Sequence, residues 1–410
     1  MKKQKDISLI SVNEELLKKL AESSATIEQL NRELEIEAAL EKVRSRTMAM
    51  QKSDELTDVA SLLFAQVNAL GIKAWTAGFN VWSDDNNSYV DYTASPSGGF
   101  IEPYTVHTER AEALRDISDA RKSRVEFDVL YVEGEKIKQL YLALTRLGEK
   151  QFEKMLQDGV QFPSHQYEHF VFGSKVSLMF ITYEPVPEAH DIFKRLGKVF
   201  EQTYTRFLDL KKAEAQAREA RIQLSLERVR ARAMAIHHSD ELSEVLSVLF
   251  DQFDVLDVSP MYTFLSLIDL KKNSFIYRQT GRGGKRVVVH QIIDLNAMDV
   301  WKEAVERWKT AKYDSIETIY APKELVPEVF EVFNDTYSAL PDGAKVYPED
   351  FPDGMYTTLA ASKFGHLGYD HHRPSTEEEK SILLRFNTEF VRLYQHFLDL
   401  QKAEAQAREA

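Results

Sequence analysis

The 410-residue sequence contains no cysteine. This absence excludes disulfide bonds, thiolate metal sites, a cysteine nucleophile and any chromophore that is attached through a cysteine. No stretch approaches 18 uninterrupted apolar residues, and the N-terminus lacks the apolar core and cleavage site of a signal peptide. These two absences predict a soluble, cytoplasmic protein that makes no contact with a membrane. The formal net charge of −13 argues against nucleic acid as a partner.

Helix-breaking residues are missing from two long segments. No glycine or proline occurs before Gly71, and none lies between Gly197 and Pro260. Both segments carry small or apolar residues at alternating spacings of four and three, which is typical of a coiled-coil contact line. In both, the line slips out of phase partway along, and such a slip changes the winding of a supercoil.

We interpret these lines as the contact surface of a parallel homodimer. An amphipathic helix that lies on its own domain is the alternative for the first segment, but a line of two residues in seven favours a partner helix. For the second segment, a two-state signalling helix and a plain spacer both remain open. The predicted dimer contacts are Ile36, Leu40, Val43, Ala213, Ala217, Ala220, Ile222, Leu226 and Val229.

A repeat divides the chain. The segment Phe207–Leu242 recurs in part at Leu40–Leu56, 186 residues before the matching Leu226, and in part at Phe397–Ala410, 190 residues after Phe207. Each interval has the length of one globular domain. The predicted organisation is a coiled-coil helix at 1–52, a domain at 53–205, a connecting coiled coil at 206–238, a second domain at 239–396 and the start of a further helix at 397–410.

The residue patterns of both domains predict an α+β fold. In the first, Ala74–Trp82 and Tyr89–Ala94 flank the turn-rich SDDNNS and predict a β-hairpin. Helical stretches follow at 110–123 and 136–157, and strands at 169–172 and 175–183 precede a long helix that begins near Glu188. The second domain has a similar order, with its exit helix capped at Ser375 or Thr376. This order favours an antiparallel sheet with helices on one side over a doubly wound sheet.

No catalytic motif is visible, so we predict that the chain as given is not an enzyme. The segment GRGGKR lacks the spacing of a phosphate-binding loop and predicts a hairpin turn, although Arg282 could contact an anionic ligand. His366, His371 and His372 lie close to Asp370 and invite a metal interpretation, but they straddle a strand end and a loop, and a surface loop without metal is favoured. No metal site and no particular cofactor is predicted.

Aromatic residues along the early strands could line a ligand pocket between sheet and helices, although core packing is the common role of such residues. With Arg282, the pocket candidates are Trp75, Phe79, Tyr92, Tyr262, Phe264 and Tyr277.

The strings AEAQAREARIQLSLERVRARAMAIHHSDEL and FITYEPVPEAHDIFKRLGKVFEQTYTRFLDL resemble the tandem GAF-like sensor regions of bacterial signalling proteins, particularly hybrid histidine kinases of two-component systems of the Bacteroidetes type. The resemblance covers about 35–410 and is weaker inside the second domain. It implies two GAF- or PAS-like domains, a dimer, long signalling helices and an output module further along. It carries over no ligand, because the N-K-F-D-E signature of cyclic-nucleotide GAF domains is absent.

The sequence therefore predicts a non-catalytic sensory and dimerisation region. A small-molecule ligand or a partner protein would change the packing of a GAF-like domain, and the helices would pass that change to an output module. Since the last repeat stops partway, we expect that module to be missing here. The alternative is a structural scaffold whose degenerate domains bind protein partners and no small ligand.

Overall fold

The computed structural model describes residues 2–94, 101–145, 148–159, 162–236, 238, 241–281, 288–296, 299–311, 313 and 315–409. The chain forms two compact units, Met1–Ala215 and Gln216–Ala410. Helix α6 (His190–Met234) begins in the first unit and ends in the second. No helix in the described part of the chain combines the length and the apolar character needed to cross a membrane.

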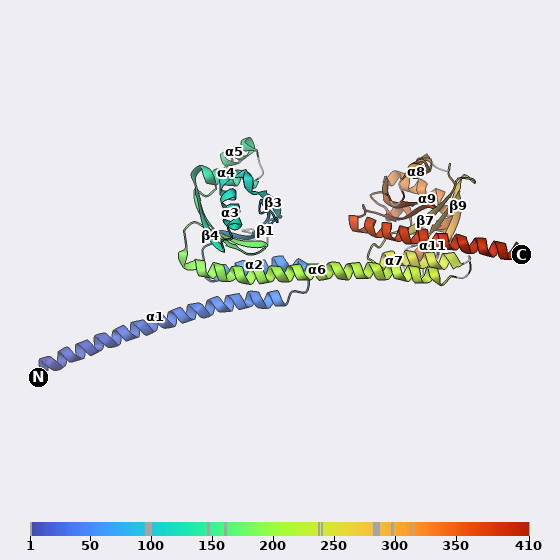
Figure 1. The fold of residues 1–410 in the computed structure, drawn as a ribbon. Helices are drawn as coiled ribbons and strands as arrows, with labels where there is room; N and C mark the ends of the chain where they lie inside the picture. The colour runs from blue at the N-terminus through green and yellow to red at the C-terminus, as the bar shows by residue number, and fades with distance from the viewer. Residues whose placement is uncertain are drawn as a thin grey trace. The chain divides into compact units, whose positions relative to one another are not determined.

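The first unit is built on a six-stranded antiparallel sheet in the order β3-β2-β1-β6-β5-β4 (Figure 1). The strands are β1 (Thr76–Trp82), β2 (Ser88–Thr93), β3 (Tyr104–His107), β4 (Phe127–Glu133), β5 (His165–Phe172) and β6 (Val176–Thr182). Its helices are α1 (Lys2–Met48), α2 (Leu56–Ala69), α3 (Glu112–Lys122), α4 (Gly134–Thr145), α5 (Glu149–Gln157) and the first part of α6.

The second unit repeats this topology, with the sheet order β10-β11-β12-β7-β8-β9. Its strands are β7 (Tyr262–Asp269), β8 (Ser274–Gln279), β9 (Val289–Asp294), β10 (Ile316–Ala321), β11 (Met355–Ser362) and β12 (Gly365–His371). Its helices are the second part of α6, α7 (Leu242–Val255), α8 (Asp299–Thr310), α9 (Val326–Val332), α10 (Asn334–Ala339) and α11 (Glu377–Glu409). The two α+β units are therefore copies of one architecture.

Each sheet is covered on both faces, which differs from the predicted one-sided arrangement. In the first unit, α2 and α6 cover one face, and α3 and α4 cover the other (Figure 1). Strand β6 shows the division, because Leu178 and Phe180 pack on the side of α6 while Met179 and Ile181 face α3 and α4. Residues alternate in this way because successive side chains of a strand point to opposite faces of the sheet.

The second half of the repeated sequence folds into a helical hairpin in both units. Helix α1 ends at Met48 and the chain turns before α2 begins at Leu56. Helix α6 likewise ends at Met234, eight residues before α7 begins at Leu242. An arginine clamps each hairpin: Arg32 Nη2 donates to Leu70 O over 2.5 Å, and Arg218 Nη2 donates to Leu256 O over 2.8 Å. The breaker-free segments are thus interrupted by turns without glycine or proline.

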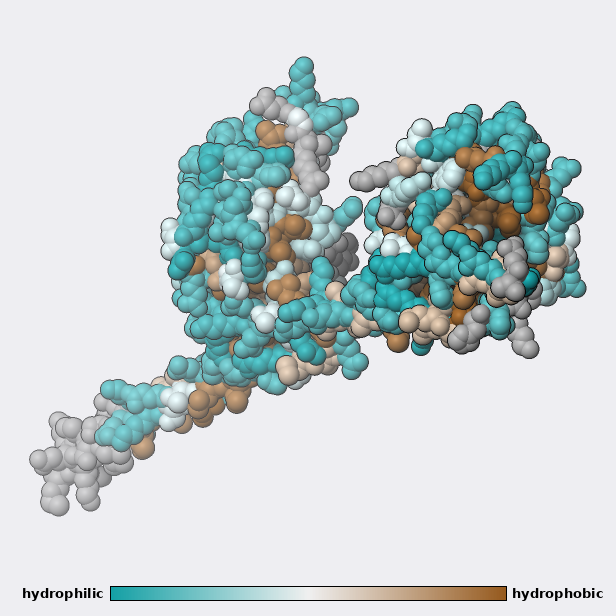
Figure 2. Space-filling view, turned by 45° about the vertical axis from the view of Figure 1, so that its right-hand side comes forward, coloured by the Kyte–Doolittle hydropathy of each residue, from teal (hydrophilic) through white to brown (hydrophobic). Residues whose placement is uncertain are grey.

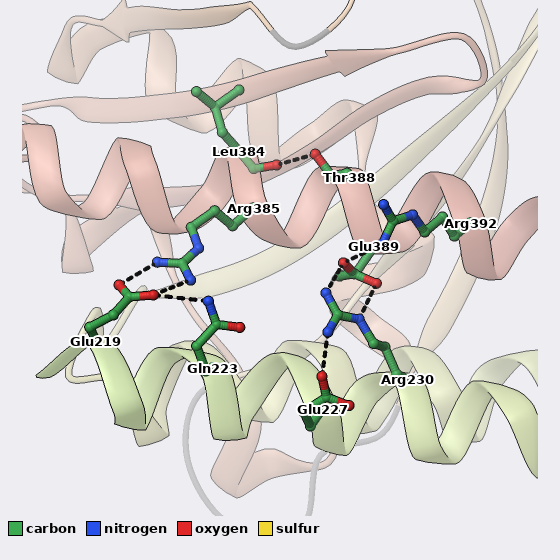
Figure 3. A network of polar contacts seen from close by, with 9 residues as sticks. All are labelled: Glu219, Gln223, Glu227, Arg230, Leu384, Arg385, Thr388, Glu389 and Arg392. Carbon is green, nitrogen blue, oxygen red and sulfur yellow. Dashed lines mark hydrogen bonds and ion pairs between the residues drawn. The ribbon is translucent and has the colours of Figure 1, made fainter. Parts of the chain in front are cut away.

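A second repeated contact joins the entry and exit helices of each unit. In the second unit Arg385 of α11 binds Glu219 of α6 through two hydrogen bonds of 2.8 and 2.9 Å (Figure 3). The ion pair between Arg195 and Glu33, 2.8 Å long, occupies the corresponding place in the first unit. Glu389 of α11 adds a pair with Arg230 of α6 in the second unit (Figure 3).

The predicted dimer contacts divide into two groups. Ile36, Leu40 and Val43 are buried within the first core, against helices and strands of their own chain. Ile222, Leu226 and Val229 are buried in the same way in the second core. Their periodicity reflects packing inside the chain, which corrects their assignment to the dimer. Ala213, Ala217 and Ala220 are exposed along α6.

Most predicted elements are present, and three strands were not predicted. These are β3, β4 and β10, and all three lie at the edge of a sheet. The predicted cap of the exit helix is a capping box: Glu379 N donates to Thr376 Oγ1 over 3.2 Å and Thr376 N to Glu379 Oε2 over 2.7 Å.

Candidate ligand site

A cavity of about 310 Å³ lies in the first unit, between the sheet and helices α3 and α4. Strands β1, β2, β5 and β6 supply its sheet side, and the other face of these strands packs on α2 and α6. Its walls are mainly apolar and aromatic. The described lining includes Trp75, Tyr89, Ala94, Ile101, Tyr104, Leu114, Leu140, Tyr141, Leu144, Met179 and Ile181. A cavity of this size and character suits a small molecule.

Two carboxyl groups line this apolar cavity. Asp91 of β2 is 5% exposed and Glu168 of β5 is 3% exposed. Burial raises the pKa of Asp91 to about 6 and that of Glu168 to about 7, where a hydrogen bond from Gln166 opposes the rise and the charge of Asp91 adds to it. Burying an ionised carboxylate is costly, so a fold that served only as a core would gain by replacing both groups.

The two carboxyl groups differ in how well they are satisfied. Asn80 Nδ2 donates to Asp91 Oδ1 over 2.8 Å, Thr93 Oγ1 donates to Asp91 Oδ2 over 2.5 Å, and Tyr104 is a third hydrogen-bond partner. Glu168 accepts on Oε1 from Gln166 Nε2 over 2.5 Å, and within the described residues its Oε2 has no hydrogen-bond partner. Glu168 is therefore the carboxyl group with capacity left for a ligand.

Further polar groups surround Glu168. Tyr141 of α4 donates its hydroxyl to Gln166 Oε1 over 2.8 Å, so the cavity wall holds Gln166 in the orientation that serves Glu168. The indole Nε1 of Trp75 is buried and has no acceptor in the part of the chain that the structure describes. No lysine, arginine or histidine occurs among the described lining residues. The site thus offers acceptors and the indole donor of Trp75 beside two acidic side chains.

The structure places the predicted pocket residues of the first unit on different faces. Trp75 lines the cavity. Phe79 and Tyr92 lie on the opposite face, where their rings stack at 4.5 Å and Phe79 packs 5.0 Å from Phe200 of α6. They belong to the core under α2 and α6, because strand alternation carries them away from the cavity, and the pocket assignment is corrected for both.

The corresponding face of the second sheet is filled. Tyr262, Phe264 and Tyr277 are buried there together with side chains from α9 and α10. Phe333 lies 4.2 Å from Tyr277, and the hydroxyl of Tyr337 donates to that of Tyr262 over 2.5 Å. The space left beside Phe264 and Tyr277 measures about 20 Å³. These three aromatic residues therefore form a packed core and line no ligand-sized cavity.

Strand pairing explains the difference between the units. Asp91 is paired with Asn80 of β1, and the residue at this position of β8 is Tyr277, which is paired with Ser266. A carboxyl group in the first unit is thus replaced by an aromatic ring in the second. Arg282, the remaining pocket candidate, lies outside the described residues.

The predicted histidine loop is a buried strand. His366, Asp370 and His371 all belong to β12 and are at most 8% exposed, which corrects the surface-loop interpretation for these three. His372 follows the strand and is exposed. Burial raises the pKa of Asp370 to about 7 and lowers that of each histidine to about 4. Thr357 donates to Asp370 within this core. No group of three metal-ligating side chains occurs among the described residues.

Asp91 and Glu168 were missed from the sequence, although a signal was present. Each is an acidic residue within a strand of aromatic and β-branched residues, SYVDYT and HQYEHFVF. An acidic residue in such a strand usually lies on the solvent face. Here α3 and α4 cover that face. The sequence does not show which face of the sheet these two helices cover.

No family model and no curated protein sequence matches the chain. Among solved structures, it is similar to the bacteriophytochrome RpBphP3 from the photosynthetic bacterium R. palustris, with a TM-score of 0.35 and 10% sequence identity. The alignment covers 87% of this chain and 75% of that one. A likeness of this size carries no argument about the function of this chain.

Proposed function

We propose that the chain is a sensory and dimerisation region whose first GAF- or PAS-like domain binds a small molecule in the cavity beneath α3 and α4. The observation that carries this proposal is the cavity itself, about 310 Å³ in volume, mainly apolar, and lined by two buried carboxyl groups. Close packing normally leaves few voids in a core, and buried charges are costly to retain. A ligand accounts for both features.

The same strands connect the cavity to α6. Met179 and Ile181 of β6 line the cavity, while Phe180 between them stacks on Phe193 of α6 with ring centroids 4.3 Å apart. A ligand that displaces β6 therefore changes the packing of α6 directly. Helix α6 continues into the second unit, and an output module after α11 is the proposed destination of the signal. A ligand can drive such a change only to the extent that it binds the two packings differently.

We propose that the N-terminal part of α1 forms the contact between the two copies of a dimer. Leu16, Leu20, Ile27, Leu30 and Leu34 keep the coiled-coil spacing and are exposed, with Leu20 at 67% and Leu34 at 68%. Apolar side chains are visible on the surface of this helix in Figure 2. A stripe of this length, which no described residue of its own chain covers, fits a second copy of α1 arranged in parallel.

The second unit serves in this proposal as a structural domain that holds α6 and α11 together. Its filled cavity face is the observation behind that role. If the first cavity also binds nothing, the remaining candidate is the scaffold, in which both domains present surfaces to partner proteins.

The test is a comparison of the full chain with Leu140→Trp, which places a large ring in the cavity wall. Native mass spectrometry after gentle purification should find a small molecule on the unaltered chain and none on the variant, and a small-molecule library should raise the melting temperature of the unaltered chain only. An unaltered chain that carries and binds no small molecule under either method would leave the scaffold as the function.

A further inference from the structure

We propose that the cavity of the first unit takes an organic cation, a small molecule with an apolar body and a protonated amine that pairs with Glu168. This inference rests on the proposed function, in which the cavity is a ligand site, and it names the chemical class of that ligand.

The charge of the lining selects the sign of the ligand. The described lining contains two carboxyl groups and no lysine, arginine or histidine. A phosphate or carboxylate ligand would lie buried beside like charge with no cation to compensate it. A neutral apolar ligand would leave the carboxyl groups as costly as before. A cation converts the buried Glu168 from a cost into a binding contact and is also favoured by the charge of Asp91 nearby.

Glu168 is the contact that such a cation would use. Both oxygens of Asp91 already accept hydrogen bonds from Asn80 and Thr93. Glu168 is 3% exposed, it lines the cavity, and its Oε2 has no partner among the described residues. A protonated amine carries only donors, so it matches this free acceptor. Asp91 contributes negative charge nearby, which raises the affinity for a cation without a contact of its own.

The remaining walls fit the rest of such a molecule. Tyr104, Tyr141 and Trp75 present aromatic rings at the cavity, and ring faces attract cations. Leu140 and Ile181 provide apolar surface for the body of the molecule. The unpartnered indole Nε1 of Trp75 is a donor for an acceptor atom elsewhere on the ligand.

The second unit supplies a matched control. Asp370 is also a buried carboxyl group, 2% exposed, but it accepts hydrogen bonds from Thr357 and Tyr262. The space described on this face measures about 20 Å³, which is too small for such a ligand. One cation per chain is therefore expected, bound in the first unit.

The experiment uses three probes of one shape on the full chain at pH 8: 2-phenylethylamine, 2-phenylethanol and 3-phenylpropanoate. Isothermal titration should show the amine binding at one site per chain, about tenfold or more tightly than the alcohol, with the carboxylate weakest. Glu168→Gln should remove this preference for the amine and leave the alcohol's affinity unchanged. Asp370→Asn should change no affinity. Near-UV circular dichroism establishes that each variant is folded.

The outcomes separate this inference from the proposed function. If amine and alcohol bind equally, or the carboxylate binds best, and Leu140→Trp abolishes that binding, the cavity is a ligand site and the cationic class is refuted. The same holds if Glu168→Gln and Asp91→Asn both leave amine binding intact. If no probe binds, or if Leu140→Trp leaves all binding unchanged, the inference and the proposed function fall together.

Discussion

Glu214 of α6 accepts two hydrogen bonds from Ser53, one from the backbone N–H over 2.9 Å and one from the hydroxyl over 2.7 Å. Ser53 lies in the turn between α1 and α2. In the second unit Glu404 of α11, which occupies the place of Glu214 in the repeat, lies 3.7 Å from His238 in the turn before α7. The two halves of the repeated sequence therefore meet in space, since the exit helix of each unit reaches the turn of its entry hairpin.

This contact predicts that Ser53→Ala destabilises the first unit. The turn loses a hydrogen bond from a hydroxyl to the charged Glu214, so we expect a melting temperature about 2–4 °C lower. Differential scanning calorimetry of the full chain measures the change. Ser24→Ala, at an exposed site of α1, is the control and should cause no loss. An unchanged melting temperature for Ser53→Ala would show that the turn does not depend on this contact.

Periodicity predicted the buried faces of the long helices but not what covers them. Ile36, Leu40 and Val43 show the spacing of a coiled-coil line, and they pack against their own chain. The same spacing at Leu16 and Leu20 leaves those side chains exposed. Apolar residues at alternating spacings of three and four indicate only that one face of a helix is apolar. What packs against that face depends on where the chain turns. That turn is made by capping contacts, which leave a weak signal in the sequence.

The candidate site was predictable in part. Trp75 is one of the aromatic residues along the early strands from which a pocket is predicted, and it lines the cavity. Trp75 and Phe79 are four residues apart, so strand alternation alone would place both on one face. They separate because Trp75 lies before β1 begins at Thr76, and the sequence does not fix that strand boundary to the residue. The sequence does not distinguish Glu168 from a surface acid, because its burial depends on the packing of α3 and α4 against β5.

The pH dependence of stability should reveal the burial of Glu168. Its pKa is raised to about 7 in the folded state from an ordinary 4.5, so the folded state binds this proton more tightly than the unfolded state. The associated stability is present at low pH and is lost as the pH rises toward 7, by about 2–3 kcal/mol. Glu168→Gln should therefore gain stability relative to the unaltered chain between pH 5 and pH 8.

Urea unfolding at several pH values measures this difference. Burial also lowers the pKa of His169 to about 4, which makes stability rise with pH. His169 is present in both proteins, so its contribution cancels in the difference between them. The exposed Glu109→Gln serves as the control and should show no trend with pH. A constant difference between Glu168→Gln and the unaltered chain would mean that Glu168 is not buried as described.

The filled face of the second sheet predicts a large cost for Phe333→Ala. Phe333 is 2% exposed and lies 4.2 Å from Tyr277, so its removal opens a cavity in a packed core. We expect a loss of about 3–5 kcal/mol in the unfolding free energy of the second unit. Leu325→Ala, at an exposed site in the same part of the chain, should cost little. A small loss for Phe333→Ala, resolved in urea, would argue that this face is loosely packed.

Two aspartates on the exposed stripe of α1 should separate the proposed dimer. Leu20→Asp with Ile27→Asp places like charges opposite each other in a parallel coiled coil, and the stripe loses much of its apolar area. Sedimentation equilibrium should then give a monomer or a dimer weakened at least about tenfold. The matched control is Lys18→Asp with Gln29→Asp, two exposed positions off the stripe. Equal association of all three proteins would exclude α1 as the interface.

Because the sequence has no cysteine, single introduced cysteines can test by crosslinking whether α6 responds to a ligand in the cavity. Ala213 and Ala217 are exposed on α6, and in a parallel dimer with α6 at its centre the two copies of each would approach within disulfide distance, about 4.4–6.8 Å between Cα atoms. Ala213→Cys and Ala217→Cys should form interchain disulfides, whereas Lys212→Cys, off this line, should not. Addition of 2-phenylethylamine should change the ratio of the two crosslinks, and Leu140→Trp should abolish that response because it fills the cavity. Crosslinks that form equally with and without the amine would mean that the cavity and α6 are uncoupled, and the absence of any crosslink would remove α6 from the dimer interface.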